Sequence, residues 1–207
     1  MDGTLVDSMV YWQRLGREYL TAQGVTKGVD EVLERIKAMT MAESSALFIK
    51  TFGLPGTPES VAAEMNAVMD EHYRSDIPLK PGASAYLAAL KARGTKMCVA
   101  TATPEPLARA CLTRLGVADF FQLILSCDAV AAGKDRPDVF LEAARRLGTD
   151  PADTAVFEDA LFAVRTAREA GFYTVGIYDP SGAAHWAQVQ LLADETVTDW
   201  ADALNRL

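Results

Sequence analysis

The spacing of apolar residues changes part-way along the chain, and this change constrains the fold more than any other feature of the sequence. Over residues 9–77, apolar residues recur every three or four positions, as at Val61, Met65 and Val68, which is the spacing of amphipathic helices. Thr57-Pro58 is typical of a helix start, with a capping hydroxyl followed by proline in the first turn. We therefore predict several short helices and no strand over this stretch.

Beyond residue 80, short apolar runs alternate with segments that have helical spacing. We expect strands at Met97–Ala100, Leu123–Leu125, Ala155–Phe157 and Thr174–Ile177. Short buried strands that alternate with helices indicate a parallel sheet with helices on both faces. The sequence therefore predicts a doubly wound, Rossmann-like α/β core made of residues 1–8 and 80–207, with residues 9–79 inserted as an all-helical domain.

The acidic composition argues against nucleic acid as a partner. The formal net charge is −8, the pI is near 4.8 and the basic residues are scattered, so phosphate backbones are repelled. No apolar run approaches the ~20 residues that cross a bilayer, and no apolar leader opens the sequence. Cys98, Cys111 and Cys127 lack metal-ligand spacing, which suits free thiols in a reducing compartment. We expect a soluble, cytoplasmic monomer that binds neither nucleic acid nor membranes.

Polar residues follow the predicted strands, where open α/β folds place their chemistry. Thr101 follows the first strand, Lys134 lies in the loop after the second, and Glu158-Asp159 follows the third. Asp2 adds a carboxylate beside a glycine turn. A hydroxyl, an ammonium and carboxylates on one rim can together hold Mg²⁺ and a phosphoryl group. Each residue alone has a simpler role, as a helix cap, a solvated lysine or a turn residue, so only the combination favours a site.

The opening segment resembles the first motif of the haloacid dehalogenase (HAD) superfamily. Residues 1–8, Met-Asp-Gly-Thr-Leu-Val-Asp-Ser, match its Asp-x-Asp-Gly-Thr-Leu-Val-Asp-Ser pattern from the second position onward. Thr101 within Val-Ala-Thr-Ala-Thr resembles the second motif. Residues 133–140 resemble the third, with Asp135 where a proline is usual, and residues 156–159 resemble the fourth.

The resemblance is to subfamily I members with a helical C1 cap, of the β-phosphoglucomutase and phosphoglycolate phosphatase type. It implies a Mg²⁺-dependent phosphatase that hydrolyses a small phosphorylated metabolite, such as a sugar phosphate, through an aspartyl-phosphate. In this resemblance Asp2 is the general acid and base and, together with Glu158 and Asp159, a metal ligand. Thr101, Ala102 and Lys134 match the phosphate-binding positions, and Thr101 and Lys134 also take part in catalysis.

The resemblance also predicts a gap in the catalytic machinery. The nucleophilic aspartate of the first motif would fall immediately before Met1, after an apolar strand that lies in the middle of the sheet. We therefore expect the 207-residue chain to have little or no phosphatase activity. A truncated record, a miscalled start and an inactive HAD-like binding protein each remain open as explanations.

A phosphosugar mutase is the main alternative enzyme. Mutases of this type carry a Ser-Arg step in the cap, and Thr40-Met41 stands at that position, which favours a hydrolase. A phosphoaccepting receiver domain would need its acidic ligands near its beginning, whereas Glu158-Asp159 comes late in the chain. The helical insertion offers side chains that could set specificity, namely Tyr11, Trp12, Arg35, Lys37 and Met41.

Overall fold

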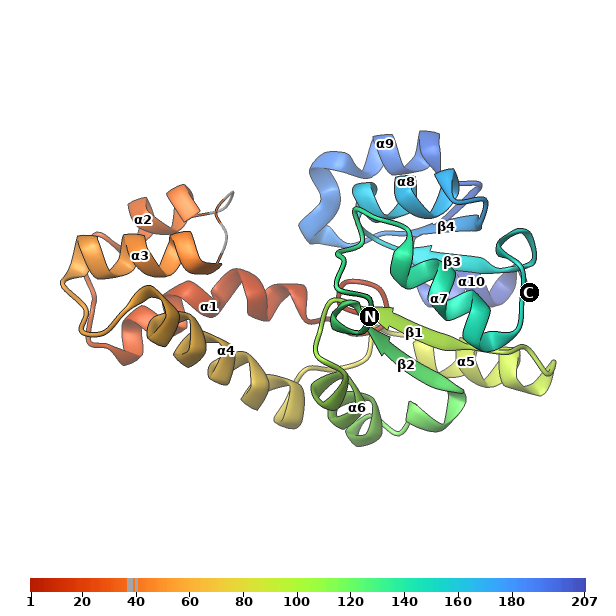
Figure 1. Ribbon diagram of the computed structural model, residues 1–207, viewed down its shortest axis with the longest axis horizontal. Coiled ribbons are helices and arrows are strands. Elements are labelled where there is room, and N and C mark those ends of the chain that lie inside the picture. Colours follow the sequence, from red (N-terminus) through yellow and green to blue (C-terminus); the bar gives the residue numbers. More distant parts are fainter. Residues whose placement is uncertain (37–38, 40) are drawn as a thin grey trace. The chain divides into compact units, whose positions relative to one another are not determined.

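The structure is a computed structural model that describes residues 1–36, 39 and 41–207 (Figure 1). It divides into two compact units, the larger formed by Met1–Met9 with Arg74–Leu207 and the smaller by Val10–Tyr73. Two residues named in the sequence analysis lie outside the described residues. They are Lys37, a predicted specificity residue, and Thr40, which stands at the Ser-Arg position of the mutases.

The smaller unit is a few residues shorter than the predicted insertion of residues 9–79. The difference arises because the chain beyond Arg74 bonds to the opening segment. The Asp7 N–H donates to the Pro78 carbonyl at 3.0 Å, and the Lys80 N–H donates to the Leu5 carbonyl at 2.8 Å. That residues 9–79 form a separate inserted domain stays a prediction.

Helices form the regular structure described in the smaller unit: α1 (Met9–Ala22), α2 (Val29–Ile36), α3 (Met41–Phe52) and α4 (Pro58–Ser75). In α4, the buried residues Val61, Met65 and Met69 recur every four positions and form the apolar stripe that packs into the core of this unit. The predicted cap of α4 is confirmed, because the Ser60 N–H donates to the Thr57 hydroxyl oxygen at 3.3 Å.

Parallel strands form the centre of the larger unit: β1 (Cys98–Thr101), β2 (Leu123–Ser126), β3 (Ala155–Glu158), β4 (Tyr173–Ile177) and β5 (Glu195–Val197). β1 pairs with β2, and β4 lies between β3 and β5. The strands predicted from apolar runs are confirmed to within one residue at each end. β5 was not predicted, because Glu195-Thr196-Val197 carries almost no apolar signal.

Helices cover both faces of these strands, as Figure 1 shows. They are α5 (Ala83–Ala92), α6 (Glu105–Arg114), α7 (Asp138–Leu147), α8 (Leu161–Glu169), α9 (Trp186–Leu192) and α10 (Trp200–Asn205). Neighbouring residues of β3 face opposite layers: Val156 packs against the apolar cluster of α7 and α8, whereas Phe157 lies 5.7 Å from Tyr86 and 5.6 Å from Trp200 between ring centroids. The doubly wound α/β fold is thereby confirmed.

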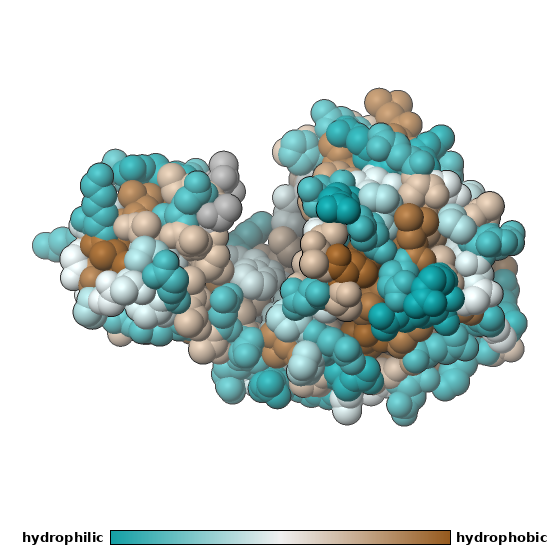
Figure 2. All heavy atoms as spheres, in the orientation of Figure 1, coloured by the Kyte–Doolittle hydropathy of each residue, from teal (hydrophilic) through white to brown (hydrophobic). Residues whose placement is uncertain are grey.

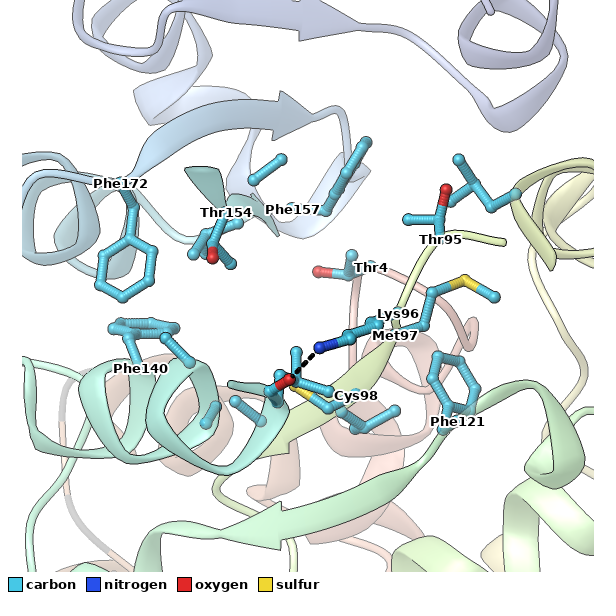
Figure 3. Close-up of a pocket in the computed structure, with 18 of the residues that line it drawn as sticks. Thr4, Thr95, Lys96, Met97, Cys98, Phe121, Phe140, Thr154, Phe157 and Phe172 are labelled. Atoms are coloured by element: carbon cyan, nitrogen blue, oxygen red, sulfur yellow. Dashed lines mark hydrogen bonds between the residues drawn. The ribbon is translucent and has the colours of Figure 1, made fainter. Parts of the chain in front are cut away.

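A cavity of about 400 Å³ lies between β1 and β3, and residues from both strands line it. Because β1 pairs with β2 and β3 pairs with β4, the sheet among the described residues is divided at this cavity. Figure 3 shows Phe140 and Phe172 facing each other on one side of the cavity, with Cys98 and Phe157 on other walls. Met1 also lines it, so the cavity reaches the opening segment.

Hydrophilic residues cover most of the face drawn in Figure 2, and hydrophobic residues are interspersed among them. Phe162 of α8 and Leu191 of α9 are exposed, as single apolar residues on protein surfaces often are. Among the helices of the described residues, none has both the length and the apolar character needed to cross a membrane.

The indole of Trp200 provides a test of how the core supports the opening segment. Trp200 is buried, and its Nε1–H donates to the Thr4 carbonyl oxygen at 2.9 Å. Trp200→Phe leaves that buried acceptor without its donor, so we expect the free energy of unfolding to fall by about 1–3 kcal/mol. Urea denaturation measures the loss. The matched control is Trp186→Phe, because Trp186 of α9 is a partly exposed tryptophan. Equal losses in the two variants would contradict this role for Trp200.

Candidate active site

The carboxyl ends of the parallel strands place polar residues at one rim of the larger unit. Thr101 ends β1, Ser126 ends β2 and Glu158 ends β3. Thr101 is paired with Ser126 in the register of β1 and β2. The loops that leave these strands carry Ala102, which is exposed, and Asp159, which is partly buried.

The opening turn meets Asp159 directly. Gly3 has a φ of 67°, in the left-handed region that glycine adopts without strain. A Cβ at Gly3 would lie 2.7 Å from the Asp159 Cγ, so any larger residue would push this carboxylate away. The Thr4 hydroxyl donates to Asp159 Oδ1 at 2.7 Å. Residues from the first and fourth motif regions, more than 150 positions apart, thus form one contact.

Asp2 is held through both of its carboxylate oxygens. The Ser8 hydroxyl donates to Oδ1 and the Thr103 hydroxyl donates to Oδ2, each at 2.7 Å. The Thr103 N–H in turn donates to the Thr101 hydroxyl oxygen at 3.1 Å. The structure therefore connects two predicted site residues, Asp2 and Thr101, through Thr103.

Lys134 and Glu158 form an ion pair, with their side chains 11% and 6% exposed. Burial disfavours the charge of Lys134, but the Glu158 carboxylate beside it outweighs that cost and raises the lysine pKa. The ion pair keeps Lys134 protonated, and its two charges balance each other. It also means that one oxygen of Glu158, a predicted metal ligand, accepts from Lys134.

The pKa of Asp159 is raised to about 6, chiefly by burial and then by the negative charge of Glu158. The hydrogen bond from Thr4 acts in the opposite direction. A carboxylate whose charge is disfavoured in this way gains stability from a nearby cation. Asp159 is therefore the side chain at this rim that is best suited to a divalent metal ion.

The donor set fits Mg²⁺, which prefers oxygen ligands and often binds through only one or two carboxylates. Asp159 offers a partly buried carboxylate, and Gly3, which has no side chain, leaves room for it. Within the described part of the chain, no group of three or more His, Cys, Asp and Glu side chains is arranged to hold a metal ion. A cation here would thus need main-chain oxygen or water ligands besides Asp159.

Thr103 is the site residue that sequence reasoning missed. In the Val-Ala-Thr-Ala-Thr segment, Thr103 is a second hydroxyl two positions beyond Thr101 on the same loop. Its buried position and its bond to Asp2 distinguish it from an ordinary loop threonine. The partner lies 101 positions away, so local spacing could suggest Thr103 but could not identify its role.

The family profile of haloacid dehalogenase-like hydrolases matches residues 1–171. The chain belongs to this family. This HAD-like hydrolase is 28% identical to a bifunctional riboflavin kinase/FMN phosphatase from Arabidopsis thaliana, over 98% of the chain and 52% of that protein. It thus spans about half the length of that relative.

Two other relatives align with most of this HAD-like hydrolase and over most of their own length. The fructose-1-phosphate phosphatase YqaB of Escherichia coli is 27% identical, over 86% of the chain and 93% of the relative. A HAD family hydrolase from Deinococcus radiodurans R1, solved with bound phosphate and sodium, superposes with a TM-score of 0.76. At 22% identity over the whole chain and 93% of that protein, the superposition shows a shared fold.

The raised pKa of Asp159 predicts a pH-dependent stability without divalent metal. Between about pH 4 and pH 6 the folded chain keeps a proton on Asp159 that the unfolded chain has released, so the free energy of unfolding falls as pH rises through this window. Asp159→Asn should remove that part of the pH dependence. Urea denaturation at pH 4, 5, 6 and 7 measures it, with the exposed Asp119→Asn as control. A pH profile for Asp159→Asn that parallels the unaltered chain would contradict the assignment.

Proposed function

We propose that this HAD-like hydrolase is a Mg²⁺-dependent phosphatase for small phosphomonoesters such as sugar phosphates. The observation that carries the proposal is the contact of Asp159 with the Gly3-Thr4 turn, which unites the first and fourth motif regions at one rim. The phosphatase names of the Arabidopsis and Escherichia coli relatives support the reaction class.

Mg²⁺ would be held by the Asp159 carboxylate and the main-chain carbonyl of Asp2. Glu158 contributes through its charge and through its ion pair with Lys134. When bound, the ion would shield the negative charge between a nucleophile and a phosphate group.

Asp2 is proposed as the general acid and base. Its two hydroxyl donors, Ser8 and Thr103, hold the carboxylate in one orientation. In that orientation it would give a proton to the leaving oxygen of the ester and later take one from water. Proton transfer of this kind depends first on geometry, which these hydrogen bonds fix.

The phosphate would be bound by Thr101, Ala102 and Lys134. Thr101 lies at the end of β1 and Ala102 is exposed in the loop that follows, where a main-chain N–H can serve an anion. Lys134 would neutralise charge that develops on the phosphoryl oxygens, because Glu158 keeps it protonated.

The nucleophile of the proposed reaction is an aspartate directly before Met1. The cavity between β1 and β3 supports this proposal, since most of its lining is apolar, residues of both strands line it and it reaches Met1. An extended segment in that space would bring its last residue to the rim beside Asp2. An inactive binding protein is the alternative that this gap leaves open.

A mutase is the second candidate enzyme. Of the Thr40-Met41 step only Met41 is among the described residues, at the start of α3. A methionine there cannot supply the charge-assisted bidentate hydrogen bonds by which an arginine grips a second phosphate. Hydrolysis is therefore favoured, and Tyr11, Trp12, Arg35 and Met41 stay as proposed specificity residues.

Mg²⁺ affinity tests the metal assignment. Asp159→Ala removes an anionic ligand, whereas Thr101→Ala removes a neutral hydroxyl, so we expect the first variant to weaken Mg²⁺ binding by about tenfold or more and the second by much less. Isothermal titration calorimetry of the 207-residue chain measures both affinities. Equal Mg²⁺ affinities in the two variants would reject Asp159 as a ligand.

Restoring the nucleophile tests the reaction. The chain that starts at Met1 should show little or no turnover, whereas a chain extended by its own upstream residues, with aspartate before Met1, should hydrolyse small phosphomonoesters in Mg²⁺. Replacing that aspartate by asparagine is the matched control and should lower kcat by several orders of magnitude. Phosphate release across a panel of sugar phosphates and FMN is the measurement. Robust turnover from Met1, or an inert extended chain, would contradict the proposal.

A further inference from the structure

A buried ion pair lies beside the candidate active site, and the proposed function gives it no role. Lys80 Nζ lies 2.6 Å from Asp179 Oδ2, and the two side chains are only 11% and 1% exposed. Removing both charges from water has a large desolvation cost that offsets most of their attraction, so such a pair contributes little net stability by itself. Its position at the rim points to a different role.

Lys80 connects the opening segment to the end of β4. Its N–H donates to the Leu5 carbonyl at 2.8 Å, and the neighbouring Leu79 forms an antiparallel bridge with Val6. Its Nζ also donates to the Tyr178 carbonyl at 3.1 Å. Main-chain bonds hold the Lys80 backbone at the opening segment, and the Tyr178 carbonyl and Asp179 hold its ammonium.

Asp179 lies two residues beyond β4, in the segment that leads to Gly182. Its Oδ1 accepts from the Ser181 N–H at 2.9 Å and from the Ser181 hydroxyl. A Cβ at Gly182 would lie 3.6 Å from the Asp159 carbonyl oxygen, so the segment that Asp179 holds packs against Asp159. The charge of Asp179 also contributes to the raised pKa of Asp159, after burial and Glu158.

We propose that the Lys80–Asp179 pair sets the electrostatic potential at the cation site on Asp159. Asp179 adds a negative charge that attracts a divalent ion, and Lys80 limits this attraction by neutralising it. The inference rests on the metal site of the proposed function. Because the two charges have opposite signs and occupy nearly the same place, removing one must change metal affinity in the direction opposite to removing the other.

The test is Mg²⁺ titration calorimetry on the 207-residue chain and three variants. Lys80→Gln leaves the Asp179 charge uncompensated and should tighten Mg²⁺ binding by about threefold to tenfold. Asp179→Asn leaves the Lys80 charge uncompensated and should weaken binding by a similar factor. The double variant should bind within about twofold of the unaltered chain, since it restores the charge balance.

Ser181→Ala is the control for a purely structural role. It removes the hydrogen bond that the Ser181 hydroxyl donates to Asp179, keeps the one from the Ser181 main-chain N–H and changes no charge, so Mg²⁺ affinity should hardly change. If Lys80→Gln does not fold, weaker binding in Asp179→Asn than in Ser181→Ala still supports the inference, and equal binding overturns it.

The outcomes separate this inference from the metal site itself. Weaker binding in both single variants, or unchanged binding in both, overturns the electrostatic role while leaving the site on Asp159 intact. If the unaltered chain binds no Mg²⁺, or if the Asp159→Asn variant binds Mg²⁺ as tightly as the unaltered chain, both the metal site and this inference are refuted.

Discussion

The contact between the Gly3-Thr4 turn and the Asp159 carboxylate is the constraint on which the candidate site depends. Gly3 has no side chain, so the Asp159 carboxylate can lie against it. The Thr4 hydroxyl donates to this carboxylate at 2.7 Å and orients it. Trp200 holds the same turn from within the core through the Thr4 carbonyl. Packing, backbone conformation and electrostatics therefore all act on one carboxyl group, which is the group best suited to a cation.

Charge balance explains why the rim can hold several carboxylates in a largely buried setting. Glu158 is paired with Lys134 and Asp179 with Lys80, and the side chains of both pairs are almost excluded from solvent. Asp159 instead accepts from a neutral hydroxyl and has a raised pKa. A divalent ion beside Asp159 would favour the charge that burial and Glu158 disfavour there.

The sequence predicted the parts of the structure that have a local signal. Alternation of apolar runs and helices located β1 to β4, and the Thr57-Pro58 step located the start of α4. Polar residues after the strands predicted Thr101 and Glu158-Asp159 at the strand ends, where the structure places them. β5 could not be predicted, because a strand of three residues with one apolar side chain has no clear periodicity.

Contacts between distant residues could not be predicted in this way. Thr103 bonds to Asp2 and Lys80 pairs with Asp179, across 101 and about a hundred positions, and no local pattern encodes either partner. Asp179 follows the fourth strand as polar residues follow the first three, so only its position after a strand has a local signal. Its pairing with Lys80 depends on how residues 78–80 return to the opening segment, which only the folded chain shows.

The location of a bound cation would show whether Asp159 is a metal ligand. A crystal structure of the 207-residue chain grown with Mn²⁺, with the ion located by anomalous scattering, would show where a divalent metal binds. We predict a single strong peak coordinated by the Asp159 carboxylate and the Asp2 main-chain carbonyl oxygen. A peak elsewhere on the chain, with Asp159 bonded only to Thr4, would contradict it.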